Sequence, residues 1–142
     1  GEGAPVELSL GAGSGTPGDT PLAARFRVAA LGDGRFTGTG PFYRGARFEL
    51  GPMALLELGG VRIAVASRKQ QAADQAMFRH LRAEPADHAV LVLKSSVHFR
   101  ADFGPIADRI LVVEAPGPNT ADPAKLPFGN LRPGMRTSPR RR

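Results

Sequence analysis

One short stretch of the sequence carries the side chains best suited to binding chemistry. The apolar run Ala89–Leu93 is followed by five residues with side-chain donors: Lys94, Ser95, Ser96, His98 and Arg100. We expect a buried strand to end here and a helix to begin. Ligands in open α/β sheets bind at the carboxyl ends of strands, because helix N-termini there present unpaired N–H groups and a positive partial charge. These five residues therefore predict a binding site for an anion or a substrate carboxylate.

A second polar cluster follows another apolar run. Val61–Ala66 leads directly into Ser67-Arg68-Lys69-Gln70-Gln71. If Val61–Ala66 and Ala89–Leu93 are neighbouring parallel strands, their ends point the same way and both clusters open on one rim of the sheet. We therefore add Ser67 and Arg68 to the predicted substrate-binding residues.

Each of the five residues after Ala89–Leu93 also has a purely structural interpretation. Lys94 and Arg100 can be solvated surface charges, and serines often cap helices. A histidine such as His98 can pack against its neighbours and bond to the backbone. The sequence leaves both interpretations open, and the grouping of five donors is the observation that favours binding.

The residues that could hold a metal ion do not follow a metal-binding spacing. His80 and His88 are eight residues apart, His98 lies beyond a predicted strand, and Glu84 and Asp87 flank a proline-initiated turn. The sequence contains no His-Glu-x-x-His motif, and catalytic zinc usually takes three converging protein ligands. We therefore assign neither metal ligands nor catalytic residues to this chain.

In the N-terminal half, the side chains of residues 24–31 alternate with the period of two that is typical of a half-buried strand. Tight turns are expected at Gly32-Asp33-Gly34, which would fold the next strand back on the preceding one, and at Gly59-Gly60. This half is therefore predicted to be an antiparallel meander, with strands at Val6–Leu10, Ala24–Leu31, Arg35–Thr37, Arg47–Leu50, Met53–Leu58 and Val61–Ala66.

The second half alternates between helical and strand-like segments. A helix is expected at Asp74–Leu81 with its first residue as the N-cap, and a second helix is expected after Ser95 or Ser96. Apolar strands are expected at Ala89–Leu93 and Arg109–Glu114, so the order is β-α-β-α-β with parallel pairing. The predicted fold class is α/β, or α+β, with a mixed sheet in which the antiparallel meander precedes this β-α-β-α-β half.

Length and composition predict one domain. The chain has 142 residues and no cysteine, which permits a reducing compartment. Its longest apolar runs fall far short of the roughly 20 residues that span a bilayer. We expect a cytoplasmic protein without membrane attachment, with its domain in residues 1–133 and a disordered basic tail in residues 134–142.

The net charge of +6 does not by itself predict a nucleic-acid partner. Four of the positive charges belong to arginines in the last seven residues. Elsewhere the basic residues form no stripe with interleaved aromatic side chains, and Tyr43 is the one tyrosine. The electrostatic and stacking features of nucleic-acid binding are therefore weak, and we expect no such partner.

The donor-rich stretch resembles the signature of a known family. Lys94–Ala101, followed by Phe103 and Pro105-Ile106-Ala107, closely resembles the KS-x-x-HFRA-x-F-x-P-x-A signature in the C-terminal domain of the microcystin-degradation protein MlrC family. The resemblance covers residues 1 to about 133. Further motifs occur in the family's order: Gly32-Asp33-Gly34-Arg35-Phe36, Gly40-Pro41, Gly51-Pro52, Ser67-Arg68, Gln70-Gln71, Phe78-Arg79, Pro116-Gly117 and Arg132-Pro133.

The resemblance implies part of a zinc-dependent peptidase or amide hydrolase, from a bacterial family known for its action on linearised microcystin. In that family the zinc ligands and catalytic groups belong to a larger N-terminal domain, so zinc is the implied cofactor of the full-length protein and is held outside this chain. By analogy, Lys94, Ser95 and His98 line the substrate side of the cleft between the two domains. The implied partners are the metal-binding domain, in the same protein or in a separate chain, and a peptide substrate. The isolated chain is expected to be inactive, and a homo-oligomer is compatible with the sequence.

An alternative function is a stand-alone, non-catalytic module. The same polar rim would serve a domain that binds an anionic or peptide ligand without hydrolysing it. Copurifying zinc, or hydrolysis of small peptides by the isolated chain, would favour catalysis over binding alone.

One departure from the family pattern concerns the end of the first predicted helix. The family usually has glycine where Arg82 follows Leu81 in this chain. Because glycine is the common residue after a helix C-terminus, we expect this helix to be capped differently here.

Overall fold

The computed structural model describes residues 1–11, 18–113, 115 and 122–137. The chain divides into two units, which are treated separately below. The first comprises Gly1–Leu8 and Ala23–Leu111, and the second comprises Ser9–Leu22 and Val112–Arg142. Both predicted polar clusters belong to the first unit.

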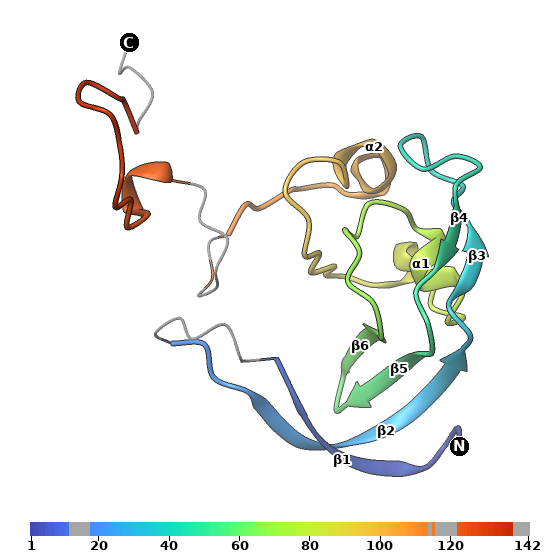
Figure 1. The fold of residues 1–142 in the computed structure, drawn as a ribbon. Coiled ribbons are helices and arrows are strands. Elements are labelled where there is room, and N and C mark those ends of the chain that lie inside the picture. Colours follow the sequence, from blue (N-terminus) through green and yellow to red (C-terminus); the bar gives the residue numbers. More distant parts are fainter. Residues whose placement is uncertain (12–17, 114, 116–121, 138–142) are drawn as a thin grey trace. The chain divides into compact units, whose positions relative to one another are not determined.

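The larger sheet has four strands in the order β1-β2-β5-β6 (Figure 1). β5 pairs antiparallel with both β2 and β6, and the pairing of Leu58 with Val61 leaves a two-residue turn at Gly59-Gly60. The antiparallel pairing of residues 53–58 with residues 61–66 and this turn were predicted correctly, whereas the predicted meander is interrupted because β2 pairs with β5 and not with β3. Both Leu55 and Leu56 of β5 are buried, as expected for a central strand that is covered on both faces. The bounds of these strands are β1 Pro5–Leu10, β2 Leu22–Gly32, β5 Met53–Leu58 and β6 Val61–Ala66.

A small second sheet corrects the predicted hairpin at Gly32-Asp33-Gly34. β3 (Arg35–Thr37) pairs antiparallel with β4 (Arg47–Glu49), and not with the preceding strand β2. The physical reason is that Gly34 is held elsewhere. Its N–H donates to His80 Nε2 at 3.0 Å, and its carbonyl accepts from the N–H of Leu50. The turn therefore carries the chain from one sheet to the other.

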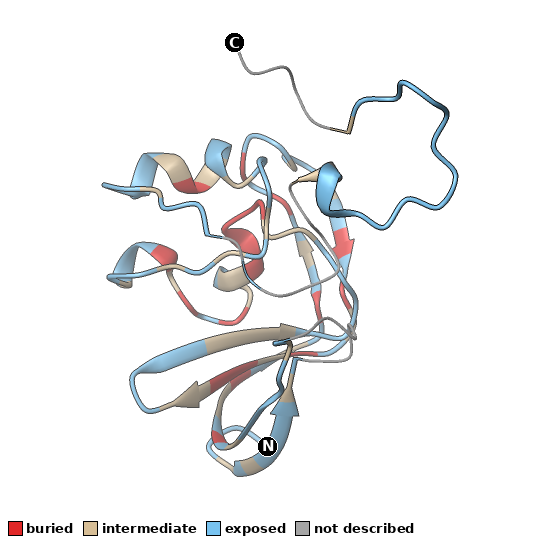
Figure 2. Cartoon of the chain, turned by 90° about the vertical axis from the view of Figure 1, so that its left-hand side faces the viewer, coloured by how far each residue is buried: buried red, intermediate tan, exposed pale blue. Residues whose placement is uncertain are grey.

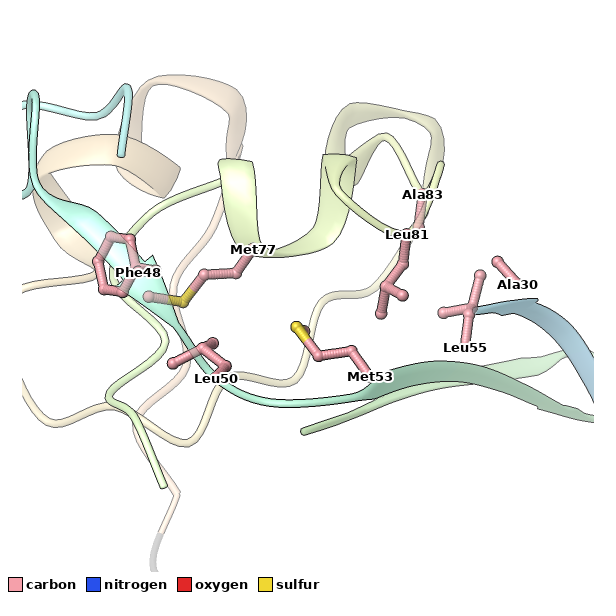
Figure 3. Close-up of a cluster of buried hydrophobic side chains, with 8 residues drawn as sticks. All are labelled: Ala30, Phe48, Leu50, Met53, Leu55, Met77, Leu81 and Ala83. Atoms are coloured by element: carbon pink, nitrogen blue, oxygen red, sulfur yellow. The ribbon is translucent and has the colours of Figure 1, made fainter. Parts of the chain in front are cut away.

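The core of the first unit lies between the two sheets' apolar faces and the segment around α1 (Ala76–Arg79). Met77 and Leu81 point from this segment toward Leu50 and Met53 (Figure 3). A helix was predicted at residues 74–81, and the structure confirms helix at its centre over a shorter length. The buried cluster consists of Ala30, Phe48, Leu50, Met53, Leu55, Met77, Leu81 and Ala83.

The remaining helices are single turns. η1 spans Pro85–Asp87, α2 spans Arg100–Phe103, and η2 spans Gly104–Ile106. α2 begins later than the helix predicted after Ser95 or Ser96, and neither serine caps it, since Phe99 occupies the N-cap position. Residues 96–99 form a bend and a turn that lead the chain into α2.

The strands predicted at residues 89–93 and 109–114 are not formed by the described residues. Residues 89–93 and 109–113 belong to no sheet, and residue 114 lies outside the described part. Val90 and Val92 are 77% and 87% exposed, and Leu111 is 70% exposed. A strand needs a neighbour for its backbone groups, and neither run has one here. The mixed α/β class is confirmed, whereas the β-α-β-α-β order of the second half is corrected to short helices joined by exposed linkers (Figure 2).

The second unit contains η3 (Pro123–Lys125) and a turn in which the N–H of Met135 donates to the carbonyl of Arg132. Most of the glycine-rich run near residue 12, residues 116–118 and residues 138–142 lie outside the described part of the chain. The predicted basic tail at 134–142 is therefore described only for its first four residues. Within the described ranges, no helix is long and apolar enough to cross a membrane.

Candidate functional site

The two polar clusters predicted from the sequence meet through one hydrogen bond. Gln71 Nε2 donates to Ser95 Oγ at 2.9 Å, although the two residues are 24 positions apart. The sequence analysis expected the clusters to share a rim, and they do lie together at this point. They are not brought there by neighbouring parallel strands, because residues 89–93 form no strand. Instead, the extended chain after β6 carries Gln71 to Ser95.

His98 is placed by an aromatic stack. Its imidazole lies against the ring of Phe42, with centroids 3.9 Å apart and planes 9° from parallel. Phe42 also meets Tyr43 edge-on at 4.6 Å, and the Tyr43 hydroxyl accepts from Gln70 Nε2 at 2.8 Å. His98 is thus exposed on one side and supported on the other. This arrangement leaves the ring accessible to a ligand while fixing its plane.

Three more of the predicted residues lie at the surface without an ion pair. The side chains of Lys94, Ser96 and Arg100 are exposed, and none forms a salt bridge with any residue in the described ranges. The Arg100 guanidinium carbon lies 5.2 Å from the centroid of the Phe99 ring. An exposed ammonium group and an exposed guanidinium group, neither with an ion-pair partner among the described residues, favour an anionic group as ligand.

Ser67 and Arg68 use their side chains to hold the backbone. Ser67 Oγ donates to the carbonyl of Pro52 at 2.7 Å, and Arg68 Nη1 donates to the carbonyl of Glu49 at 3.1 Å. These bonds tie the end of β6 to the connection between β4 and β5. The geometry therefore gives both residues a supporting task at the edge of the cluster.

A buried carboxylate holds the loop that carries Phe42. Asp74 is fully buried, and its Oδ2 accepts from the N–H of Gly40 at 2.8 Å. Its Oδ1 accepts from the N–H of Ala76 at 2.9 Å and from Thr39 Oγ1 at 3.3 Å. Asp74 was predicted as the N-cap of α1; the N-cap residue is Gln75, one position later, while the Asp74 carboxylate bonds to the N–H of Ala76 in the first turn of that helix. Its second task, fixing the loop at residues 38–46, was not predicted.

Gly40 is packed against a second carboxylate. A Cβ at this position would lie 2.5 Å from Asp102 Cγ, so no side chain fits. Asp102 itself accepts from the N–H of Gln75 at 2.7 Å, while Gln75 Nε2 donates to the Asp102 carbonyl at 2.7 Å. The loop that bears Phe42 and the helix that follows His98 are thus fastened to the same segment before α1.

The aromatic anchor of the 94–100 segment is Phe103. It is buried in α2 and meets Phe78 edge-on, with ring centroids 5.9 Å apart. Phe42, Tyr43 and Gln70 were not among the predicted site residues. The glycines at both ends of the loop, Gly38 and Gly45, were a signal of a tight loop, but nothing in the sequence linked that loop to His98.

The histidines do not gather around a common point. His80 Nε2 accepts from the N–H of Gly34, His88 Nδ1 lies 2.9 Å from the carbonyl of Glu84, and His98 stacks on Phe42. In the part of the chain that the structure describes, no three His, Asp or Glu side chains lie close enough to hold a metal ion. The residues described here therefore do not fit a zinc site.

The comparison that decides the family covers nearly the whole chain. A family profile described as the MlrC C-terminus matches residues 1–130. The chain belongs to the MlrC C-terminal family. In this MlrC C-terminal domain, the signature at residues 94–101 supplies Ser95, which bonds to Gln71, and His98, which stacks on Phe42. The expected family membership is thus confirmed.

The MlrC C-terminal domain is also similar to a solved structure. A crystal structure of a "putative metallopeptidase" from Mesorhizobium sp. BNC1 matches 94% of this chain with 28% identity and a TM-score of 0.79. The match covers 26% of that protein, so the chain spans about a quarter of its length. No curated protein sequence matches the chain.

Proposed function

We propose that this domain lines the substrate side of a cleft in a peptidase or amide hydrolase of the MlrC type. The observation that carries the proposal is that Gln71 and Phe42 hold Ser95 and His98 in place, while Lys94 and Arg100 in the same short segment are exposed. Exposed cations beside a supported imidazole would orient a peptide and complement its carboxylate. The description of the similar Mesorhizobium protein as a metallopeptidase supports the reaction class.

We place the metal of such an enzyme on an accompanying domain. Catalytic zinc usually takes three converging protein ligands, and the described residues bring no such set together. When bound there, zinc would polarise the scissile carbonyl and activate water. The task of this chain is to hold the peptide, with Lys94 and Arg100 facing negative charge and His98 presenting its ring to the substrate backbone.

The proposal is tested in the intact polypeptide by the variants Lys94→Ala and His98→Ala. Both are expected to lower kcat/KM for a short peptide by about tenfold or more, as for the loss of a hydrogen bond to a charged group. The metal content, measured by atomic emission, should stay at the wild-type level. Arg25→Ala is the charge-matched control, because Arg25 is an exposed cation on β2, away from the cluster. Wild-type turnover in both variants, or loss of metal, would remove the proposed role.

A non-catalytic binding module is the second function that the same surface supports. The unpaired Lys94 and Arg100 would bind an anionic peptide whether or not a metal site lies opposite. The discriminating outcome is peptide binding by the isolated chain, measured by calorimetry, together with no hydrolysis by the intact polypeptide at any metal concentration. Peptide hydrolysis that requires metal would support the peptidase function over the binding module.

A further inference from the structure

The segment at residues 89–93 has the sequence of a strand that is covered on both faces. It reads Ala-Val-Leu-Val-Leu, with no polar residue and two β-branched side chains. Unbroken apolar runs of this length are typical of strands inside a parallel sheet, whereas strands with one wet face alternate with polar residues. In the described structure these residues have no such neighbours.

The structure covers one face of this segment and leaves the other bare. Leu91 and Leu93 are half-buried, whereas Val90 and Val92 are 77% and 87% exposed. The exposure therefore alternates with a period of two, as in an extended chain. The residue just before the segment, His88, has φ −111° and ψ 130°, which is β backbone.

The backbone of the segment is free to pair. Among the described residues, no N–H of residues 89–93 donates a hydrogen bond, and the one carbonyl bond is that of Leu93 with the N–H of Ser95. Unpaired backbone donors along an extended apolar chain are the feature that lets a segment add to the edge of another sheet.

We propose that residues 89–93 form a strand that adds to the open edge of a β-sheet in the remainder of a longer polypeptide. We place the partner sheet in the remainder of a longer polypeptide because the match covers only 26% of the similar Mesorhizobium protein. The pairing would satisfy the free N–H groups, and Val90 and Val92 would lie on one face of the combined sheet, where elements packed on that face would cover them. This inference rests on the proposed function in one respect only, because both require an accompanying domain.

Strand addition also gives the donor cluster its position. Lys94, Ser95 and His98 follow the segment directly, so they would lie at the carboxyl end of a strand in the combined sheet. That end is where open α/β sheets bind ligands. The sequence-based expectation of a strand followed by a binding rim would then hold for the assembled protein, with the sheet supplied from outside this chain.

Hydrogen exchange measured by mass spectrometry tests the pairing without any assay of turnover. The amides of residues 90–93 are compared in the isolated 142-residue chain and in the intact polypeptide made by the cell. We expect exchange about 100-fold slower in the intact polypeptide, as for amides in a stable sheet. Equal exchange in both proteins would overturn the proposal. Slow exchange in the isolated chain that depends on its concentration would also overturn it, since a second copy would then be the occupant.

A matched pair of variants locates the contact. Val92→Lys in the intact polypeptide should speed exchange at residues 90–93 by about tenfold or more, because the ammonium would be buried on the covered face of the combined sheet. Val61→Lys places the same change at another exposed valine, 60% exposed at the start of β6, and should leave that exchange unchanged. Both variants should leave the Tm of the isolated chain unaltered. Unchanged exchange in Val92→Lys would contradict docking through this face.

The outcomes separate docking from catalysis. Protected amides at residues 90–93 in a protein without peptidase activity would leave the docking inference standing and remove the proposed function. Peptidase activity in a protein whose amides at residues 90–93 exchange freely would leave the proposed function standing and remove the docking inference.

Discussion

The imidazole of His98 lies flat on the ring of Phe42, with centroids 3.9 Å apart and planes 9° from parallel. The two residues come from different segments. His98 belongs to the family signature, and Phe42 belongs to the loop between β3 and β4. The stack fixes the plane of a surface histidine that nothing else in the described residues holds.

Phe42→Ala should release His98 with a moderate loss of stability. Phe42 is 46% exposed, and aromatic pairs contribute about 0.5–1.5 kcal/mol beyond their buried area. We expect the His98 ring protons to lose their ring-current shift in NMR spectra, while the free energy of unfolding falls by about 1–3 kcal/mol, from the lost aromatic pair and the lost burial together. Leu31→Ala, at an apolar side chain of β2 in the same unit that is 51% exposed, should leave the His98 resonances in place. Unchanged His98 resonances in Phe42→Ala would show that the stack does not persist in solution.

Gly40→Ala should destabilise the loop that carries Phe42. The added Cβ would lie 2.5 Å from Asp102 Cγ, and overpacking of this kind costs about 1–3 kcal/mol. Gly60→Ala is the control, because a Cβ there meets nothing within 4 Å. In chemical denaturation, the free energy of unfolding of Gly40→Ala should be lower than that of Gly60→Ala by that amount. Equal midpoints for the two variants would mean that the loop is not packed against Asp102.

The antiparallel half of the fold could be predicted from the sequence because its signals are local. Apolar runs on both sides of Gly59-Gly60 define two strands and the turn between them, and the pairing of Leu58 with Val61 follows. Local signals of this kind could not predict the direction in which the chain leaves Gly32-Asp33-Gly34. What directs this turn is the bond from the Gly34 N–H to His80, 46 residues away.

The substrate-binding role of the candidate site stays a prediction. Ser95 and His98 were singled out because five donors follow one apolar run, and the bond from Gln71 to Ser95 joins the two polar clusters, although not through the parallel strands that were expected. The contact of Phe42 with His98 and the bonds from Asp74 to the loop at residues 38–46 were not predicted. Contacts between residues far apart in the sequence leave no periodic pattern. The strand at residues 89–93 was expected from its apolar run, but a strand also needs a partner, and the described residues supply none.

Arg82→Gly should be more stable than Arg82→Ala. Arg82 has a φ of +58°, the one non-glycine residue with positive φ in the described ranges, just after α1. The left-handed conformation costs a residue with a Cβ about 1–2 kcal/mol, which glycine avoids. Both variants lose the ion pair with Glu2, so their difference isolates the backbone. Thermal denaturation should give Arg82→Gly a free energy of unfolding about 1 kcal/mol higher than that of Arg82→Ala. The opposite order would mean that the native turn carries no backbone strain at residue 82.

Acid should weaken the contact between α1 and η1. The Arg79 guanidinium donates to both carboxylate oxygens of Glu84, at 2.7 and 2.8 Å, and these bonds lower the pKa of Glu84 below its ordinary value. Because the folded-state pKa is depressed, the contribution to stability is present above the unfolded-state pKa and is lost as pH falls through the folded-state pKa. Glu84→Gln should therefore lower the free energy of unfolding at pH 7 and reduce its decline below about pH 4. Parallel pH profiles for wild type and Glu84→Gln would contradict this account.

The most direct test of the substrate-binding role compares one peptide in two forms, with a free C-terminal carboxylate and with a C-terminal amide. If Lys94 faces the substrate carboxylate in the intact polypeptide, Lys94→Ala should raise KM for the free acid by about tenfold and leave KM for the amide nearly unchanged. An equal change for both peptides, or no change for either, would contradict the claim that this cluster binds the substrate.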